Sequence, residues 1–160
     1  MKIIAIDPGY ERVGIAILEK NNSQKEILIY SDCFQTSSTK DFSERLNNIG
    51  QEIKRIIETH KPKIMAIESL FFNNNQKTAL QVSEAKGLIK YLALERGLEI
   101  FEYTPLQIKI AITGYGRGTK EQITSMTKNL INIEKEIKYD DEYDAIAIGL
   151  TYFAINPINK

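Results

Sequence analysis

The sequence lacks the residues that build disulfide frameworks, zinc clusters and membrane spans. Its 160 residues include one cysteine, one histidine and no tryptophan. The lone cysteine, Cys33, excludes an intramolecular disulfide and fits a reducing compartment, and with a single histidine the chain cannot form a Cys/His zinc cluster. No apolar run approaches the roughly 20 residues of a membrane-spanning helix, and no basic segment before a long apolar stretch marks a signal peptide. We therefore expect a cytoplasmic protein.

An excess of charge of either sign is also absent, because 21 lysines and arginines balance 21 aspartates and glutamates. A general polyanion binder gains its affinity from many lysine and arginine contacts to phosphate, so a neutral chain is a poor candidate for that class. Any nucleic-acid surface must then be local. A chain of this length with 42% hydrophobic residues has enough apolar material for one domain with its own core.

The apolar residues that are present predict alternating strands and helices. Short, dense apolar runs are typical of buried strands, and three- and four-residue spacing over 41–60 is typical of an amphipathic helix. The order predicts one α/β domain, residues 1–160, with a mixed five-stranded sheet that begins with three antiparallel strands and is flanked by helices. The predicted strands are 2–7, 13–20, 26–34, 63–68 and 98–104, and the predicted helices are 41–60, 76–96, 105–112, 119–133 and 141–153.

Four acidic residues stand where these elements begin or end. Asp7 ends the run KIIAID and Glu68 ends KIMAIE, while Asp141 and Asp144 lie three residues apart in DDEYDAIAIGL and share one helix face. Carboxylates that converge from distant segments repel one another, and proteins most often tolerate this repulsion to bind divalent cations. Hard oxygen ligands favour Mg²⁺ or Mn²⁺ over Zn²⁺.

Each of these residues also has a structural interpretation. Asp7 precedes Pro-Gly, which is common turn chemistry, and Glu68 at a strand end would be a solvated boundary residue. Asp141 would be an acid favoured by the dipole at a helix N-terminus. We favour a single site because it explains all four positions. Asp140 remains an alternative to Asp141 if the helix begins differently.

Three motifs in order carry a resemblance to a known family. They are IDPGYERVGIAI near the start, AIESLFFNNNQKTAL around Glu68, and the closing DDEYDAIAIGL. With these motifs the chain resembles the RuvC family of Holliday junction resolvases, in the ribonuclease H-like superfamily, over nearly its whole length. The resemblance implies a ribonuclease H-like fold and a homodimer. It also implies an Mg²⁺-dependent endonuclease that resolves four-way DNA junctions in homologous recombination and DNA repair.

The resemblance also implies roles for individual residues. Asp7, Glu68, Asp141 and Asp144 match the family's metal-binding and catalytic positions, with two Mg²⁺ ions per site and Mn²⁺ as a possible substitute. One ion would activate a water molecule for in-line attack on the phosphodiester, and the other would stabilise the departing 3′ oxygen. Among the basic residues, Lys109 and Lys120 match positions that the family uses for catalysis and DNA binding.

A basic and aromatic set is expected to bind DNA. An aromatic residue matching Phe71 stacks on a base at the junction centre in the family, and Arg117 lies in a glycine-rich loop that would approach a phosphate closely. For any one of the lysines a solvated helix face is an equally good interpretation. Lys86 stands where the family often has arginine. The expected DNA-binding residues are Phe71, Phe72, Asn75, Lys86, Lys109, Arg117 and Lys120.

Partners and competing functions follow from the same resemblance. The family implies the branch-migration proteins RuvA and RuvB as partners. We expect helix 76–96 to form the dimer face. One alternative is a ribonuclease H-like nuclease that acts on another DNA or RNA. An actin-like or sugar-kinase ATPase also begins with Asp-x-Gly after a first strand, but it needs a second domain for which this chain is too short. A junction-binding protein without catalysis is disfavoured because all four carboxylates are present.

Overall fold

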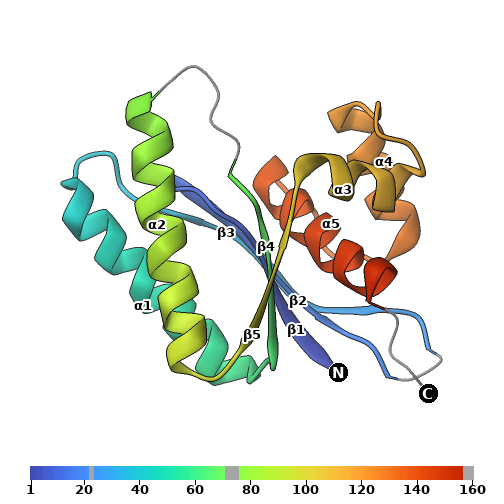
Figure 1. The fold of residues 1–160 in the computed structure, drawn as a ribbon, viewed down its shortest axis with the longest axis horizontal. Helices are drawn as coiled ribbons and strands as arrows, with labels where there is room; N and C mark the ends of the chain where they lie inside the picture. The colour runs from blue at the N-terminus through green and yellow to red at the C-terminus, as the bar shows by residue number, and fades with distance from the viewer. Residues whose placement is uncertain (22–23, 71–75, 157–160) are drawn as a thin grey trace.

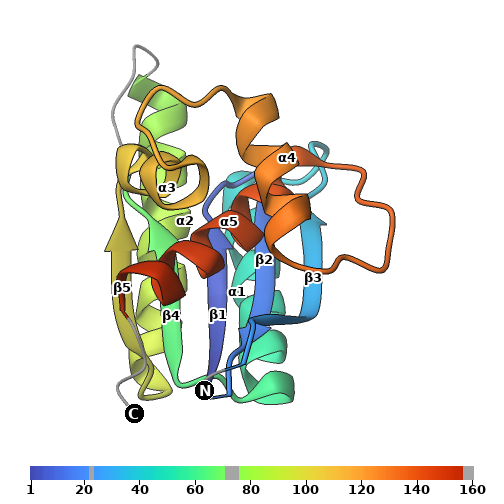
Figure 2. The same cartoon turned by 90° about the vertical axis from the view of Figure 1, so that its right-hand side faces the viewer.

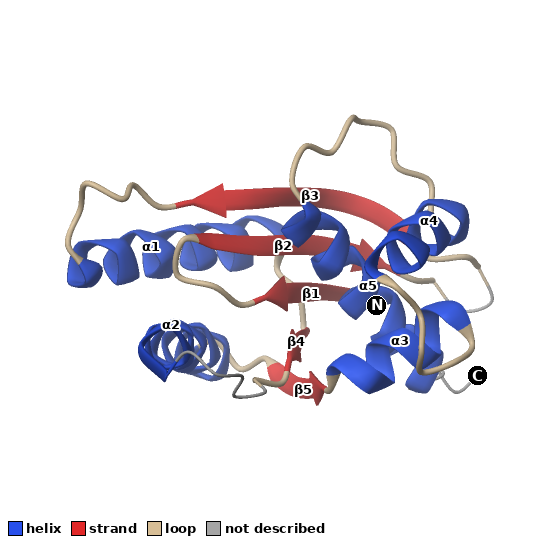
Figure 3. Ribbon diagram, turned by 90° about the horizontal axis from the view of Figure 1, so that it is seen from above, coloured by secondary structure: helices blue, strands red, loops and turns tan. Residues whose placement is uncertain are grey.

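The computed structural model describes residues 1–21, 24–70 and 76–156. Its strands are β1 (Lys2–Asp7), β2 (Arg12–Glu19), β3 (Ile27–Gln35), β4 (Ile64–Glu68) and β5 (Glu99–Tyr103). Its helices are α1 (Phe42–His60), α2 (Gln76–Glu95), α3 (Pro105–Thr113), α4 (Lys120–Leu130) and α5 (Asp140–Ile155). They form three layers, with α1 and α2 on one face of the sheet and α3, α4 and α5 on the other (Figure 1). Figure 3 shows the same separation from above.

The five strands are arranged in the order β3-β2-β1-β4-β5 (Figure 2). The first three pair antiparallel, and β4 and β5 run parallel to β1, which confirms the predicted mixed sheet. Because β1 and β4 are parallel neighbours, their carboxyl ends lie side by side at the same end of the sheet. Ile6 pairs with Ile67, so the next residues, Asp7 and Glu68, stand at the same step on adjacent strands. The register therefore brings the first two predicted acids together.

The core has two parts because β1 is covered on both faces. Ile3 and Ala5 pack in the cluster that includes α5, whereas Ile4 and Ile6 pack in the cluster that includes α1 and α2. All four side chains are fully buried. A strand that is buried on both sides has no polar face, which explains why its sequence is a continuous apolar run.

Local signals set the ends of α1. The Asp41 side chain accepts a hydrogen bond from the Glu44 N–H at the N-terminus of the helix. Four isoleucines at the predicted three- and four-residue spacing face the sheet and are buried. The chain leaves the helix through Lys61, which has a left-handed φ of 51°, and Pro62 follows.

One predicted helix end is wrong. The helix predicted over 119–133 ends at Leu130, because the next residue, Ile131, has an extended backbone. In α2, Leu80 is 62% exposed, since the first turns of α2 extend past the strands (Figure 1). Among helices of the described ranges, none combines the length and the apolarity that a membrane crossing requires.

Helix α5 crosses the sheet at close range (Figure 2). A Cβ added to Gly149 would lie 2.4 Å from Leu18 Cδ1 and 3.2 Å from the Ala5 Cβ. Leu18 is fully buried and has no free space to move into. The helix therefore depends on a residue without a side chain at this contact.

This close packing predicts that Gly149→Ala destabilises the protein by about 1–3 kcal/mol, the usual cost of forcing extra volume into a packed core. Gly87→Ala in α2 is a matched control, because a Cβ there meets nothing within 4 Å. It should be neutral or stabilise by up to about 1 kcal/mol, since alanine is the better helix former. Denaturant unfolding measures both changes, and equal effects of the two variants would contradict the close approach of α5.

Candidate carboxylate site

The site forms where the carboxyl ends of β1 and β4 meet the N-terminus of α5. Asp7 and Glu68 end the two strands, and Asp141 and Asp144 lie in the first turns of the helix. Gly14 on β2, which pairs with Asp7 on β1, makes this approach possible. A Cβ at Gly14 would stand 1.9 Å from the Asp141 carbonyl oxygen and 3.1 Å from the Asp7 Cβ. The structure thus brings together the four acids that the sequence singled out.

Mutual repulsion is visible in the pKa values of these acids. Burial raises the pKa of Asp7 well above its usual value of 3.8, and the nearby carboxylates of Glu68, Asp144 and Asp141 raise it further. Burial and then the Asp144 charge raise the pKa of Glu68 from 4.5 to about 6. Burial likewise raises the pKa of Asp144. Because all three pKa values are raised, ionisation of this cluster opposes folding at neutral pH.

Two cationic side chains offset part of this repulsion. Lys120 Nζ lies 3.3 Å from Asp144 Oδ2 and 3.4 Å from Asp140 Oδ2. Burial alone would lower the pKa of Lys120, but these two carboxylates raise it above its usual value. Arg12 Nε lies 3.5 Å from Asp141 Oδ2. The sequence prediction missed Arg12, whose only signal is its place in the motif that follows Asp7.

Exposure separates Asp140 from Asp141. The Asp140 side chain is 68% exposed, whereas that of Asp141 is 25% exposed. The charge of Asp141 raises the pKa of Asp7, and the charges of both aspartates raise the pKa of Asp144. Asp141 therefore belongs to the cluster, and Asp140 occupies the solvated position at the helix N-terminus that favours an acid.

The donors suit a hard divalent cation. Carboxylate oxygens are the preferred ligands of Mg²⁺ and Mn²⁺, and a bound cation would relieve the repulsion that raises these pKa values. Cys33 Sγ lies 4.0 Å from Asp141 Oδ2, but burial raises the pKa of this thiol to about 12, which disfavours a thiolate ligand. As the side chains stand, no three His, Cys, Asp or Glu residues in the described part of the chain are close enough to hold one ion together. Binding would therefore draw the carboxylates inward.

A pocket of about 280 Å³ opens beside the cluster. Glu68 and Asp144 form its acidic side, and Lys109 and Lys120 contribute amino groups from α3 and α4. Its remaining walls are apolar. Opposite charges around one pocket beside a carboxylate cluster suit an anionic group that is bound together with cations.

The other predicted DNA-binding residues are placed differently. Arg117 is exposed in the loop between α3 and α4. Lys86 is buried, and its Nζ lies 2.6 Å from Glu102 Oε2 on β5, so little of its charge is free for a phosphate. Its predicted DNA contact stays a prediction, and the surface proposed below does not depend on it. Phe71, Phe72 and Asn75 lie outside the described residues.

Comparison with known proteins gives matches over nearly the whole chain. The family model described as crossover junction endodeoxyribonuclease RuvC matches residues 3–152. The enzyme of that name from Moorella thermoacetica is 41% identical over 157 residues, which cover 98% of this chain and 93% of the relative. The enzyme of that name from Petrotoga mobilis is 43% identical over 152 residues, which cover 95% of this chain and 93% of the relative.

Solved structures match in the same way. Thermus thermophilus RuvC in complex with a Holliday junction substrate superposes with a TM-score of 0.88 at 27% identity, covering 95% of this chain and 92% of that one. The yeast mitochondrial Holliday junction resolvase Ydc2 has a TM-score of 0.70 at 15% identity over 96% of this chain and 78% of its own. At that identity Ydc2 supports the fold alone.

The raised pKa of Asp7 predicts that Asp7→Asn stabilises the cation-free protein at pH 8. The folded protein holds the Asp7 proton more tightly than the unfolded chain, so the cost of ionisation is absent below pH 3.8, grows as the pH rises from there to the folded pKa, and is fully present above the folded pKa. One pKa unit corresponds to about 1.4 kcal/mol, and about 1 kcal/mol moves the melting temperature of such a domain by about 2–4 °C. We expect a gain of at least about 3 °C at pH 8 and a smaller gain at pH 5, measured by thermal unfolding in EDTA.

Asp140→Asn is the control for this experiment. It removes an exposed carboxylate that favours the helix N-terminus, so it should not raise the melting temperature. If Asp7→Asn gives no gain at pH 8, or if Asp140→Asn gives the same gain, the four carboxylates do not repel one another as described.

Proposed function

This chain belongs to the RuvC family of crossover junction endodeoxyribonucleases, which are metal-dependent, and we propose that it resolves four-way DNA junctions at the carboxylate site. The observation that carries the assignment of the site is the convergence of Asp7, Glu68, Asp141 and Asp144 from three distant segments. Resolution of Holliday junctions places the protein in homologous recombination and DNA repair. A ribonuclease H-like nuclease with another DNA or RNA substrate is the competing function.

The proposed ligands are the four carboxylates. Asp7 ends β1, which lies between β4, where Glu68 stands, and β2, where Gly14 meets Asp141, so Asp7 is the ligand that would contact both ions. Two Mg²⁺ ions, with Mn²⁺ as a substitute, would supply an activated water and stabilise the departing 3′ oxygen. Glu68 would complete one coordination shell, and Asp141 with Asp144 the other. The raised pKa of Glu68, about 6, means that this ligand is fully charged only above that pH.

Lysines around the pocket would hold the phosphodiester. Lys109 and Lys120 line the same pocket as Glu68 and Asp144, so a phosphate bound there meets both amino groups. Lys120 contacts Asp144 here, and it would be available to a phosphate once a bound cation neutralised that carboxylate. Arg117, in the neighbouring loop, extends the basic surface along the DNA arm. Positive charge concentrated here allows a neutral chain to bind DNA locally.

Symmetric cleavage requires two copies of the site. Three large apolar residues of α2 are exposed to solvent: Leu80 by 62%, Tyr91 by 59% and Leu94 by 61%. At about 100° per residue they fall on one face of the helix, and such a face fits an isologous homodimer contact. A two-fold dimer matches the pseudo-symmetry of a four-way junction. Phe71, Phe72 and Asn75 follow Glu68 in the chain and remain the proposed contacts to the junction centre.

The family also suggests the cellular setting. We keep the branch-migration proteins RuvA and RuvB as proposed partners, because a resolvase acts on junctions that such proteins move. We also keep the cytoplasm as the proposed compartment, in accord with a single, unpaired cysteine.

A direct assay separates the proposed function from its competitor. We expect the protein with Mg²⁺ to cut a four-way junction in two opposed strands and to leave a linear duplex and an RNA–DNA hybrid of the same sequence intact. EDTA should abolish cleavage, and Asp7→Asn should bind the junction but reduce cleavage at least about 100-fold, because it removes a ligand between two ions. Preferred cleavage of the hybrid would favour the competing function, and cleavage by Asp7→Asn at the wild-type rate would show that the active site lies elsewhere.

The position of the basic surface is tested by salt dependence. Lys109→Ala and Lys120→Ala should each weaken junction binding and reduce the log–log salt slope by roughly 0.9 per lost phosphate contact, or twice that in a dimer. Lys25→Ala is the control, because this exposed lysine precedes β3 at the end of the sheet opposite Asp7. An equal slope change for Lys25→Ala would place the DNA path elsewhere. If cleavage is lost but the salt slope is unchanged, the lysine stabilises the transition state and does not contribute to binding of the junction.

A further inference from the structure

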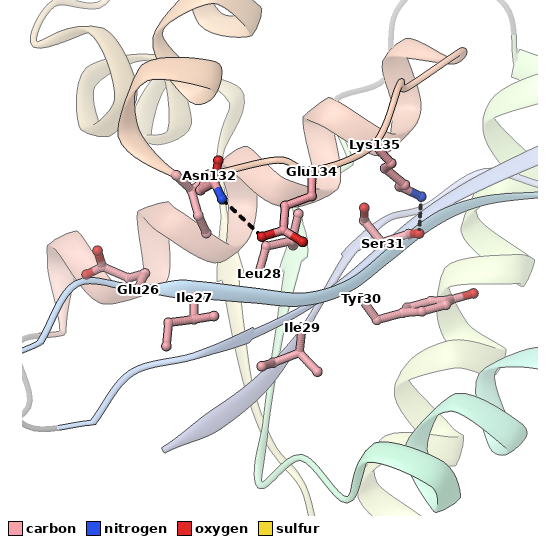
Figure 4. Close-up of a pocket in the computed structure, with 10 residues that line it drawn as sticks. Glu26, Ile27, Leu28, Ile29, Tyr30, Ser31, Asn132, Glu134 and Lys135 are labelled. Carbon is pink, nitrogen blue, oxygen red and sulfur yellow. Dashed lines mark hydrogen bonds between the residues drawn. The ribbon is translucent and has the colours of Figure 1, made fainter.

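A buried carboxylate in the first turn of α5 takes no part in the site described above. Glu142 is buried and accepts a hydrogen bond of 2.6 Å at its Oε1 from the Ser31 hydroxyl on β3. Lys135 Nζ lies 2.5 Å from the same oxygen and also donates to the Ser31 carbonyl oxygen at 2.6 Å. Figure 4 shows Lys135 reaching from the segment after α4 to Ser31 on the edge strand. Ser31, Lys135 and Glu142 form a closed set of contacts, here called the edge network.

The edge network holds a residue between two proposed ligands. Glu142 directly follows Asp141 in the helix and precedes Asp144 by two residues. Neighbouring residues on an α-helix point about 100° apart, and here Glu142 contacts Ser31 on β3 while Asp141 contacts Arg12. Whatever fixes the direction of Glu142 therefore fixes the directions of the two aspartates.

Rotation of α5 about its own axis matters, because a metal site tolerates only small displacements of its ligands. A turn of about 10° at the outer radius of a helix, about 5–6 Å, moves a side-chain atom by about 1 Å. Functional groups must be held within about 0.5 Å of their productive positions. The N-cap of the helix, Tyr139, makes no side-chain capping hydrogen bond, and the ion pairs that Lys120 and Arg12 make with the start of the helix are longer, at 3.3–3.5 Å.

Burying Glu142 also needs a compensating role. A buried carboxylate is costly unless it is paired and hydrogen-bonded, and an apolar residue would pack against a sheet without that cost. Here the carboxylate gains one hydroxyl and one ammonium partner at fixed distances. Its ammonium partner, Lys135, is half-exposed, so the network closes over the edge of the sheet.

We propose that the edge network is a positioning device that sets the rotation of α5 and so aims Asp141 and Asp144 at the metal site. Ser31, Lys135 and Glu142 are positioning residues, since none of them lies at the carboxylate cluster. The inference rests on the proposed function, because it assumes that the two aspartates bind cations. It predicts that the network affects cation affinity and turnover more than it affects DNA binding.

The test compares Ser31→Ala with a variant that loses a similar buried hydroxyl. Thr151→Val in α5 is the matched control, because the Thr151 hydroxyl is fully buried but donates to the backbone of its own helix at 2.8 Å. Mn²⁺ binding is measured by titration calorimetry without DNA, and kcat, KM and junction affinity are measured in parallel. For Ser31→Ala we expect Mn²⁺ affinity and kcat to fall by about 10-fold, as for other partners of metal ligands, with junction affinity unchanged within about two-fold. Ser31→Thr restores the hydroxyl and should restore both values.

Each further outcome has a defined meaning. Wild-type Mn²⁺ affinity and kcat in Ser31→Ala, whatever its melting temperature, would overturn the proposal, and so would an equal loss in Thr151→Val. If Ser31→Ala fails to fold, Lys135→Met serves instead, since its side chain is half-exposed, and it should show a smaller loss in the same direction. An unaffected Lys135→Met would also overturn the proposal. Asp7→Asn separates the two hypotheses: if it binds Mn²⁺ as wild type does, the carboxylate site itself is wrong.

Discussion

The contact between the first turn of α5 and Gly14 is the constraint on which the site depends. The Asp141 carbonyl oxygen occupies the space that a Cβ at Gly14 would fill, so no other residue permits this approach without a shift of the helix. Gly149 provides a similar close contact further along the helix, against Leu18. Together these contacts bring the last element of the chain onto the first strand, beside Asp7. Without them the acids of α5 would stand too far from the sheet to act with those of β1 and β4.

Close approach has an electrostatic consequence. Burial and proximity raise the pKa values of Asp7, Glu68 and Asp144, which means that the ionised site opposes folding. Lys120 and Arg12 offset part of the repulsion through their contacts with Asp144 and Asp141. Such a site gains the most from a divalent cation, because the ion replaces repulsion with coordination. The same charges that reduce stability therefore create cation affinity.

The two faces of the sheet have separate roles. α1 and α2 cover one face with an apolar layer, and α2 leaves apolar residues exposed, which we propose as the dimer contact. α3, α4 and α5 cover the other face and carry the lysines and acids of the site (Figure 1). The carboxyl ends of β1 and β4 lie between these two layers of helices.

The sequence by itself determined the order of strands and helices, because hydrophobic periodicity and turn residues act over a few neighbours. It also singled out Asp7, Glu68, Asp141 and Asp144, because motif order and element ends are visible along the chain. Only the tertiary structure decided between Asp140 and Asp141, added Arg12, paired Lys86 with Glu102 and revealed the edge network. These outcomes depend on which residues meet across long separations, such as the 111 positions between Ser31 and Glu142. Local patterns contain no information on such distances, since helix rotation and strand order are set by packing of the whole domain.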